Sequence, residues 1–566
     1  MTDRRKARKV SVVDPATINI VTNALHGIAE EMGLNLLRSA RSTIIREARD
    51  CSCALLDADG RLIAEADHAP IQMASLALPL KACLVKHDPQ TLQDGDVFLT
   101  NDPYQGGQHL QDLIVFLPVF NDGELIGFAG SVAHHIDIGG GSAGLTLDAA
   151  EIFGEGVRFT SLRLRLSDFE EGGVVHEIVH SNFREPSTSM GDLRAQLAAC
   201  LIGQARLDDL CDRYGRTTLD ECIEAGLRHS ETLMRKAIEE IPDGIYQAED
   251  FVDGDVVGNR PIRVALTLTV SGSEATLDFG GTQEQTRDFL NVPIASTLAA
   301  AYSAMTMVAA SGGRHIPANE GCHRPIHIIV PEGSFLNPRP PAAVRARMCG
   351  AYRTFDAVLM ALQCALPDRT PALGYNVNTT VGFSQTAGES FRIFIEDIGG
   401  GWGATPAADG ADMLDAPLSN CKITPVEMLE LDHPYLRVSR YEYIPDSGGA
   451  GQYRGGLGTV REYEVLDDGV TFFAYADRHR IAPRGANGGS DGLRGSFHRV
   501  TQHGATPLAS KTSLAVAAGD RIRIVAGGGG GFGPPTDRTP DAIARDELEG
   551  KTSAASKATA QGGTNV

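Results

Sequence analysis

Apolar residues recur at three- and four-residue steps in several stretches of the chain, and this spacing predicts amphipathic helices. The stretches are residues 15–49, residues 191–241 and an alanine-rich segment at residues 294–310. Strands are predicted over residues 248–279, and the second half of the chain is rich in glycine and turn residues. Helices and strands do not alternate as repeated βαβ units. We therefore predict a large α+β fold with a helical N-terminal part and a glycine-rich, β-containing C-terminal half.

Two β-hairpins are predicted within the N-terminal part. Residues 51–64 contain two apolar runs joined by Asp-Ala-Asp-Gly, and residues 113–132 contain two longer runs joined by Asn-Asp-Gly. Both connections favour the positive φ angles of tight hairpin turns. The second hairpin brings the residues just outside its two ends side by side, so Asp112 is expected next to the segment that contains His134.

Histidine and aspartate concentrate in two segments that this hairpin links. NDPYQGGQHLQD covers residues 101–112, and AHHIDIGGG covers residues 133–141. Imidazole and carboxylate groups together suit zinc, manganese or iron. His109 and Asp112 share a face if their segment makes a helical turn. A further carboxylate stands where the first helix gives way to the first hairpin, so we predict one divalent metal held by Asp50, His109, Asp112 and His134.

Three more polar residues of these segments are predicted to take part in catalysis, namely Asp102, His135 and Asp137. A ligating imidazole usually needs a hydrogen-bond acceptor on its other nitrogen, so they also suit the role of outer partners. Turn capping is the alternative interpretation, because histidine and aspartate beside glycine often cap turns. Two such segments joined by a hairpin favour the metal site.

Composition describes an ordinary soluble globular chain of 566 residues, with 42% hydrophobic and 22% charged residues. Acidic residues outnumber basic ones by 72 to 51, so nucleic acid and anionic membranes are unfavourable partners. The basic first residues are not followed by an apolar signal-peptide core, and no run approaches the roughly 18 apolar residues of a membrane span. We predict a cytoplasmic protein with free, mostly buried cysteines, because no Cys-x-x-Cys pair is present.

The pattern divides the chain into four predicted parts. Residues 1–14 form a basic flexible arm, and residues 15–245 form the metal-site domain. Residues 246–535 form a glycine-rich α+β domain. Residues 536–566 are rich in charged and small residues, which predicts a disordered tail.

A nucleotide site is not predicted in this chain. The run Gly-Gly-Gly-Gly-Gly-Phe-Gly at residues 527–533 precedes Pro-Pro and not a helix, which favours a structural or substrate-facing loop, and residues 399–403 resemble it. Gly-Lys-Thr at residues 550–552 lacks the first glycine of a P-loop, since Arg545 stands there. Substrate contacts stay open; Arg345, Arg347 and Arg353 are hypothetical carboxylate anchors, with surface salt bridges as the alternative.

These segments and several others resemble the hydantoinase B, or oxoprolinase B-type, family over nearly the whole folded chain. The motifs that carry the resemblance are RDCSCAL at 49–55, NDPYQGGQHLQD, AHHIDIGGG, GDLRAQ at 191–196, NEGC at 319–322, SGGAGQYRGGLG at 447–458 and the glycine run at 527–533. The resemblance implies a divalent metal bound through two histidines and carboxylates, which match His109, His134 and Asp112, with Asp50 the less certain match. It also implies a separate hydantoinase A-type subunit that binds ATP and Mg, in a hetero-oligomer such as a dimer of heterodimers.

The reaction that the resemblance implies is the ATP-dependent opening of a cyclic amide such as a hydantoin, a lactam or 5-oxoproline. As a mechanistic hypothesis, the metal lowers the pKa of a bound water towards ~7, and Asp102 or Asp137 accepts a proton. One alternative is a subunit of an ATP-dependent ketone carboxylase, although the chain is shorter than such subunits. A second alternative is a non-catalytic scaffold subunit, for which a depleted ligand set is expected.

Overall fold

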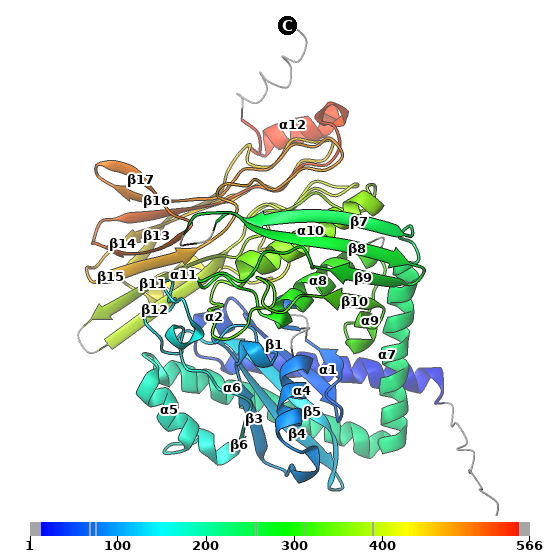
Figure 1. The fold of residues 1–566 in the computed structure, drawn as a ribbon. Helices are drawn as coiled ribbons and strands as arrows, with labels where there is room; N and C mark the ends of the chain where they lie inside the picture. Colours follow the sequence, from blue (N-terminus) through cyan, green and yellow to red (C-terminus); the bar gives the residue numbers. More distant parts are fainter. Residues whose placement is uncertain are drawn as a thin grey trace, which may run out of the picture.

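The computed structural model describes residues 13–553 except residues 67–68, 74–75, 255, 257, 312 and 388–389. Most of the predicted basic arm and the end of the predicted tail lie outside the described residues. Strands form four open sheets, and helices pack between and around them, which confirms the predicted α+β class. Figure 1 shows the N-terminal sheet in the lower part of the molecule and the other sheets above it.

Six antiparallel strands form the N-terminal sheet, in the order β2-β1-β5-β4-β3-β6. Their bounds are β1 Cys51–Asp57, β2 Leu62–Glu65, β3 Asp96–Thr100, β4 Asp112–Asn121, β5 Glu124–His134 and β6 Leu162–Arg165. The associated helices are α1 Pro15–Ser39, α2 Thr43–Arg46, α3 Pro70–Met73, α4 Ala77–Lys86, α5 Val174–Asn182 and α6 Pro186–Tyr214. Both predicted hairpins are present as β1–β2 and β4–β5.

Both faces of this sheet are covered. Successive strand residues point to opposite faces. Leu55 of β1 accordingly packs in the cluster that contains α1 and α6, whereas Leu56 packs in the cluster that contains α4. Burial on both sides explains why the strand sequences are continuously apolar and do not alternate.

A long helix and a second sheet follow. Helix α7 Arg216–Ile238 begins after Gly215, whose φ of 79° ends α6, so the predicted helix at residues 191–241 is two helices. The sheet has the order β10-β9-β8-β7. Its strands are β7 Gly244–Val252, β8 Ile262–Ser271, β9 Glu274–Asp278 and β10 Ile326–Ile329, accompanied by α8 Ile294–Ala309, α9 Glu320–His323 and α10 Met348–Ala365.

The C-terminal part contains two sheets with a shared aromatic core. Their orders are β12-β11-β15-β18 and β13-β14-β19-β16-β17. The bounds are β11 Thr379–Ala387, β12 Ser390–Ile398, α11 Val426–Asp432, β13 Leu436–Tyr443, β14 Thr459–Val465, β15 Val470–Tyr475, β16 Ser496–Thr501, β17 Gly504–Leu508, β18 Lys511–Val516 and β19 Arg521–Ala526. Phe383 and Phe472 of the first sheet pack with Tyr463 and Ile524 of the second.

The glycine runs pack against one another as stacked loops. The Gly401 N–H donates to the Gly527 carbonyl, and the Gly529 N–H donates to the Gly456 carbonyl, both at 2.9 Å. A Cβ atom added at Gly529 would lie 2.0 Å from the Trp402 carbonyl oxygen, which leaves no room for any side chain. Residues 527–533 therefore form a tightly packed loop, as the sequence predicted for this glycine run.

Three boundaries differ from the prediction. The first helix is divided into α1 and α2, because the chain turns at Ala40. One hydrophobic cluster extends from Val21 to Tyr475, so the boundary predicted at residue 245 crosses a shared core and cuts β7. The tail contains helix α12 Pro540–Leu548, where Asp546 forms an ion pair with Arg538 at 2.6 Å. The prediction of a disordered tail was therefore wrong for residues 536–553.

Within the described residues, none of the helices combines the length and apolar character needed to cross a membrane. All ten cysteines are unpaired, and Cys364 is the exposed one among them. The cysteines match the prediction of free, mostly buried thiols.

Candidate functional site

The β4–β5 hairpin brings the predicted histidine and aspartate segments together. Asp112 and His134 are direct partners in the antiparallel register. His109 precedes β4 in a turn in which its carbonyl accepts the Asp112 N–H at 3.0 Å. The two imidazole rings lie 5.0 Å apart between centroids, and His109 Nδ1 lies 2.7 Å from Asp112 Oδ2. The predicted juxtaposition of His109, Asp112 and His134 is therefore present.

Asp50 reaches the same place from the segment before β1. Its carbonyl accepts the His134 N–H at 3.0 Å, and its carboxylate accepts the Gln72 side-chain amide at 2.6 Å. A buried cavity of about 20 Å³ is bordered here by polar side chains from distant parts of the chain, including Asp50, His109, His134, Arg347, Asp397 and Ser419. Such a volume is enough for about one water molecule or one ion.

Three of the four predicted ligands, Asp50, His109 and His134, border this cavity, and Asp112 lies behind His109. Among the residues that the structure describes, the trio of His, Cys, Asp or Glu side chains whose ligand atoms lie within 4.8 Å of one another is Asp50, Asp397 and Cys421. Burial raises the pKa of the Cys421 thiol well above its usual value, so without an ion Cys421 is a neutral thiol. Asp397 is thus the carboxylate that the structure adds to the predicted set.

Burial keeps the two imidazoles neutral. It lowers the pKa of His109 to about 4, and the charge of Arg347 acts in the same direction. Burial places the pKa of His134 well below its usual value, and the neighbouring His109 ring acts in the same direction. Neutral imidazoles offer lone pairs to a cation, and His134 Nδ1 has no hydrogen-bond partner within the described part of the chain.

The carboxylates around the cavity are in excess. Burial opposes ionisation of Asp112, but the close contact with His109 Nδ1 and the charge of Arg347 outweigh burial and lower its pKa. Burial raises the pKa of Asp50 and of Asp397, and it raises the pKa of Asp415 to about 7. Buried carboxylates are costly unless they are protonated or bind a cation. The unpartnered imidazole nitrogen and this surplus of acid groups fit a divalent metal.

The three predicted catalytic residues lie elsewhere. Asp102 caps a short helical turn by accepting the Tyr104 N–H at 3.1 Å. His135 points away from His134, as successive strand residues do, and its Nε2 lies 3.0 Å from Gln196 Oε1.

Asp137 accepts the backbone N–H of Arg184 at 2.6 Å and the guanidinium of Arg184 at 3.2 Å. None of the three predicted catalytic residues borders the cavity. Each makes hydrogen bonds that hold a turn or a helix in place, and their catalytic role stays a prediction.

Sequence reasoning missed the residues that approach from far along the chain. Asp397 lies in β12, Ser419 in a loop and Gln72 in α3; no local motif marks them. Arg347 was considered as an anchor for a substrate carboxylate. It is buried and donates instead to Asp112 at 2.8 Å and to Gln108 at 3.0 Å.

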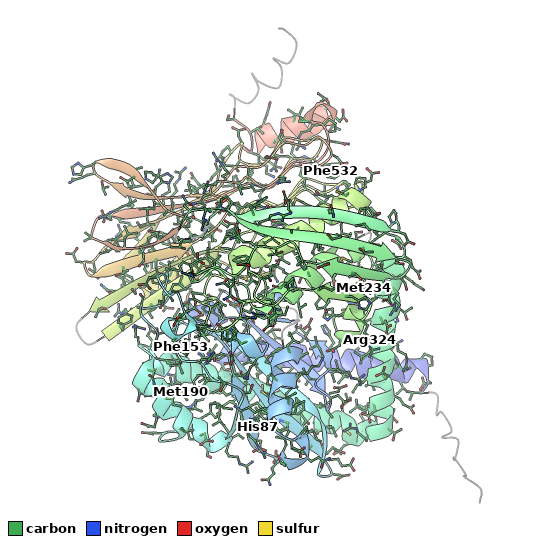
Figure 2. All side chains as sticks on the ribbon, in the orientation of Figure 1. His87, Phe153, Met190, Met234, Arg324 and Phe532 are labelled. Atoms are coloured by element: carbon green, nitrogen blue, oxygen red, sulfur yellow. The ribbon has the colours of Figure 1, made fainter. Side chains whose placement is uncertain are left out.

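The other two arginines of that hypothesis are also buried. Arg345 donates to the Gly144 carbonyl, and Arg353 lies 2.9 Å from Asp356. Surface salt bridges are therefore excluded for all three arginines. They belong to the interior, where Figure 2 shows side chains filling the space between the layers.

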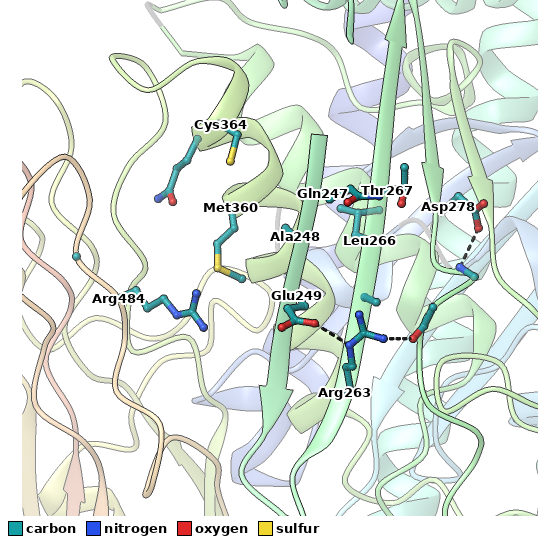
Figure 3. A pocket seen from close by; sticks show the side chains of 15 residues that line it. Gln247, Ala248, Glu249, Arg263, Leu266, Thr267, Asp278, Met360, Cys364 and Arg484 are labelled. Atoms are coloured by element: carbon teal, nitrogen blue, oxygen red, sulfur yellow. Dashed lines mark hydrogen bonds and ion pairs between the residues drawn. The ribbon is translucent and has the colours of Figure 1, made fainter. Parts of the chain in front are cut away.

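A cavity of about 860 Å³ lies apart from these histidines. It is bordered by β7, β8, the end of α10 and Arg484 (Figure 3). Its charged groups are largely engaged, since Arg263 donates to Glu249 at 2.7 Å and to the Gly281 carbonyl at 2.9 Å. None of the predicted site residues borders it, so size alone does not identify the reactive site.

Fold and site together define a class of protein: a large α+β chain whose N-terminal hairpin and C-terminal sheets enclose a small histidine and carboxylate pocket. A family model, hydantoinase B/oxoprolinase, matches residues 14–535. The chain belongs to this family.

Its relatives include components of hydrolases. The B-subunit of the putative D-/L-hydantoinase of Pseudomonas sp. strain NS671 is 34% identical, over 95% of this chain and 93% of that one. The beta-subunit of the caprolactamase of Pseudomonas jessenii is 29% identical, over 96% of this chain and 95% of that one. The 5-oxoprolinase 1 of Arabidopsis thaliana is 32% identical over 92% of this chain, which matches 42% of that longer protein.

Solved structures give the same relationship. The ATP-dependent caprolactamase from Pseudomonas jessenii superimposes with a TM-score of 0.88 at 28% identity, covering 96% of this chain and 95% of that one. A nucleotide-free acetone carboxylase superimposes with a TM-score of 0.84 at 20% identity, covering 96% of this chain and 79% of that one. At that identity the second likeness establishes the shared fold alone.

Proposed function

We propose that this chain is the metal-binding B-type subunit of an ATP-dependent hydrolase that opens cyclic amides. It works in the cytoplasm with a separate A-type subunit that binds ATP and Mg. The observation that carries the proposal is the buried cavity, sized for one ion, that two neutral imidazoles and two carboxylates border. The hydantoinase, caprolactamase and oxoprolinase names of the relatives support the reaction class.

The residues that would hold a zinc, manganese or iron ion are His109, His134 and Asp50, with Asp397 as the added carboxylate. When bound, such an ion would supply Lewis-acid polarisation of a water or of a carbonyl oxygen. Asp112 contacts His109 Nδ1 and is itself held by Arg347, so this pair fixes the orientation of the His109 ring.

Proton transfer falls to the carboxylates beside the cavity. Burial raises the pKa of Asp50 and of Asp397, so whichever of the two carboxylates does not hold the ion would accept a proton from the attacking water. Thr380 donates to Asp397 Oδ1 at 2.7 Å and thereby fixes the direction of that carboxylate. These residues replace Asp102 and Asp137 in the proposed mechanism.

Coupling to ATP has a physical reason. An unstrained ring amide is stabilised by resonance, so its hydrolysis is slow and its opening can be unfavourable. Phosphorylation of the amide oxygen by the A-type subunit would make the ring opening favourable. The absence of a complete P-loop motif from this sequence is consistent with a nucleotide site in a partner.

Co-expression with the neighbouring A-type subunit tests the proposal. Hydantoins, lactams and ketones are screened for substrate-stimulated ATP hydrolysis, with ring opening followed by chromatography. We expect a cyclic amide to stimulate turnover and His109→Ala to abolish it, while Asp102→Asn retains it. Full ring opening by His109→Ala would contradict the proposal.

The same assay separates the alternatives. A ketone carboxylase subunit, which shares the fold, requires bicarbonate for product formation and ATP hydrolysis stimulated by ketones. A non-catalytic scaffold would tolerate loss of His109 without loss of turnover. The presence of Asp50, His109, His134 and Asp397 around one small cavity favours a working site.

A further inference from the structure

Asn378 borders the small cavity, directly before β11, and has no role in the proposed mechanism so far. Thr380, two residues further on, lies opposite Asp397 in the antiparallel register of β11 and β12. Side chains two residues apart share one face of a strand. Asn378, Thr380 and Asp397 therefore stand on the same wall, and all three border the cavity.

The hydrogen bonds of this group fix the direction of the Asn378 amide. Thr380 Oγ1 donates its single hydrogen to Asp397 Oδ1 at 2.7 Å, so it accepts from Asn378 Nδ2, which lies 3.0 Å away. Burial raises the pKa of Asp397, and hydrogen bonds from Thr380 and Asn378 oppose that rise. The amide nitrogen is thus turned towards Thr380 and Asp397, and the amide oxygen is turned away from them.

This arrangement leaves the amide oxygen of Asn378 without a donor. The side chain is buried, and its Oδ1 has no hydrogen-bond partner within the part of the chain that the structure describes. A buried acceptor without a donor costs about 1–3 kcal/mol. The adjoining cavity of about 20 Å³ is large enough for one water molecule, which supplies O–H donors.

We propose that Asn378 is a further catalytic residue, whose Oδ1 accepts a hydrogen bond from the attacking water. The inference rests on the proposed function, because it assigns a residue to the water of that site. The second hydrogen of the water faces the carboxylate that accepts the proton. Both hydrogens are then held, and a lone pair of the oxygen stays free to form the bond to the amide carbon. A water fixed in this way has less freedom to lose at the moment of attack.

Kinetics of the complex with the A-type subunit test this role. Asn378→Leu keeps the side-chain volume but removes the acceptor, and it is expected to lower kcat for ring opening by about tenfold to a hundredfold. KM and the metal content of the chain should stay within about twofold of wild type. Asn378→Ala repeats the test if Asn378→Leu does not fold.

Thr379 provides the matched control. It is buried like Asn378, but it does not border the cavity, and as the next residue of the strand it points to the opposite face. Thr379→Val also removes a buried polar group, and it is expected to leave kcat within about twofold of wild type. An equal loss of kcat in both variants would overturn the inference, and so would loss of metal from Asn378→Leu.

A crystal structure of the full-length chain gives a readout that does not depend on turnover. A water is expected within about 2.5–3.0 Å of Asn378 Oδ1 and is expected to be missing from Asn378→Leu. A protein donor on Oδ1 would overturn the inference. A raised KM with unchanged kcat would assign Asn378 to substrate binding and would also overturn it.

Failure here is distinguishable from failure of the proposed function. If the wild type opens a cyclic amide in a His109-dependent way and Asn378→Leu does so with unchanged kcat, the function holds and the role of Asn378 is refuted. Without turnover in the wild type, the function and the catalytic role both fail. Crystallography then still decides whether a water is bound to Asn378.

Discussion

At the scale of single residues, Arg347 is the cation that keeps Asp112 ionised in the interior. Both side chains are buried, and their contact is 2.8 Å. Removing one partner of a buried pair leaves the other charge uncompensated, which typically costs about 3–5 kcal/mol. Arg347→Met is expected to lower the free energy of unfolding by that amount in urea titrations.

A surface pair provides the control for Arg347. Arg339 lies 3.4 Å from Glu332, and both side chains are more than half exposed, at 61% and 68%. Arg339→Met should change stability by less than about 1 kcal/mol. Equal small effects of the two substitutions would show that the Asp112 contact contributes nothing.

Glu155 gives a pH prediction with a defined sign. Burial raises its pKa to about 7, while its carboxylate accepts the Val344 and Arg345 N–H groups at 2.8 and 2.7 Å. An unfolded glutamate titrates near about 4.3, so between these values the folded state holds a proton that the unfolded state has lost. The contribution of Glu155 to the free energy of unfolding is complete below about pH 4.3. It falls as the pH rises towards 7, by up to about 1.4 kcal/mol per pH unit.

The substitution Glu155→Gln replaces the titratable carboxyl group with a neutral amide. The difference in unfolding free energy, wild type minus Glu155→Gln, should therefore decrease steadily from pH 5 to pH 7 in urea titrations. A difference that stays constant or increases over this range would contradict the assigned pKa.

Residue roles were only partly predictable from sequence. His109, Asp112 and His134 could be assembled because one hairpin connects them. Asp397 and Arg347 enter the site from more than two hundred residues away, and no spacing rule links them to the histidines. Sequence could not show that Asp102 and Asp137 lie outside the cavity, because a capping carboxylate and a catalytic one have the same local sequence.

At the scale of elements, the sheet that positions the histidines depends on close strand packing. A Cβ atom at Gly127 of β5 would lie 2.5 Å from the Leu56 carbonyl oxygen of β1. That backbone atom cannot move aside without disturbing the ladder. Gly127→Ala is expected to destabilise the protein by about 1–3 kcal/mol, measured as the free energy of unfolding.

Gly27 of α1 is the matched control for Gly127. Nothing lies within 4 Å of a Cβ atom built there. In an exposed helix interior, Gly27→Ala should stabilise by about 0.5–1 kcal/mol. Opposite signs for the two glycines are the expected outcome, and a neutral Gly127→Ala would refute the tight packing of β1 on β5.

Elements with a strong local signal were predicted well. The Asn-Asp-Gly turn and its flanking apolar runs gave the β4–β5 hairpin, and the alanine-rich segment gave α8. The split between α6 and α7 depends on the positive φ of Gly215, which sequence does not reveal among 63 glycines. Helix α12 was missed because its stability comes from Arg538, Asp409 and Asp546 and not from an apolar face.

At the scale of the whole molecule, the site lies where the N-terminal layer meets the C-terminal sheets. Asp50, His109 and His134 come from the first layer, and Asp397 comes from β12 (Figure 1). One hydrophobic cluster crosses this junction. The pocket therefore exists only when both parts have folded against each other, which is why composition and local pattern could indicate a site but could not complete it.

The metal content of the purified full-length chain tests the central claim most directly, measured by mass spectrometry with His134→Ala and His135→Ala as neighbouring variants. His134 borders the cavity, whereas His135 points to Gln196. The expected result is one divalent metal per chain in the wild type and in His135→Ala, and none in His134→Ala. A wild-type chain without stoichiometric metal, or equal metal in all three proteins, would contradict the account.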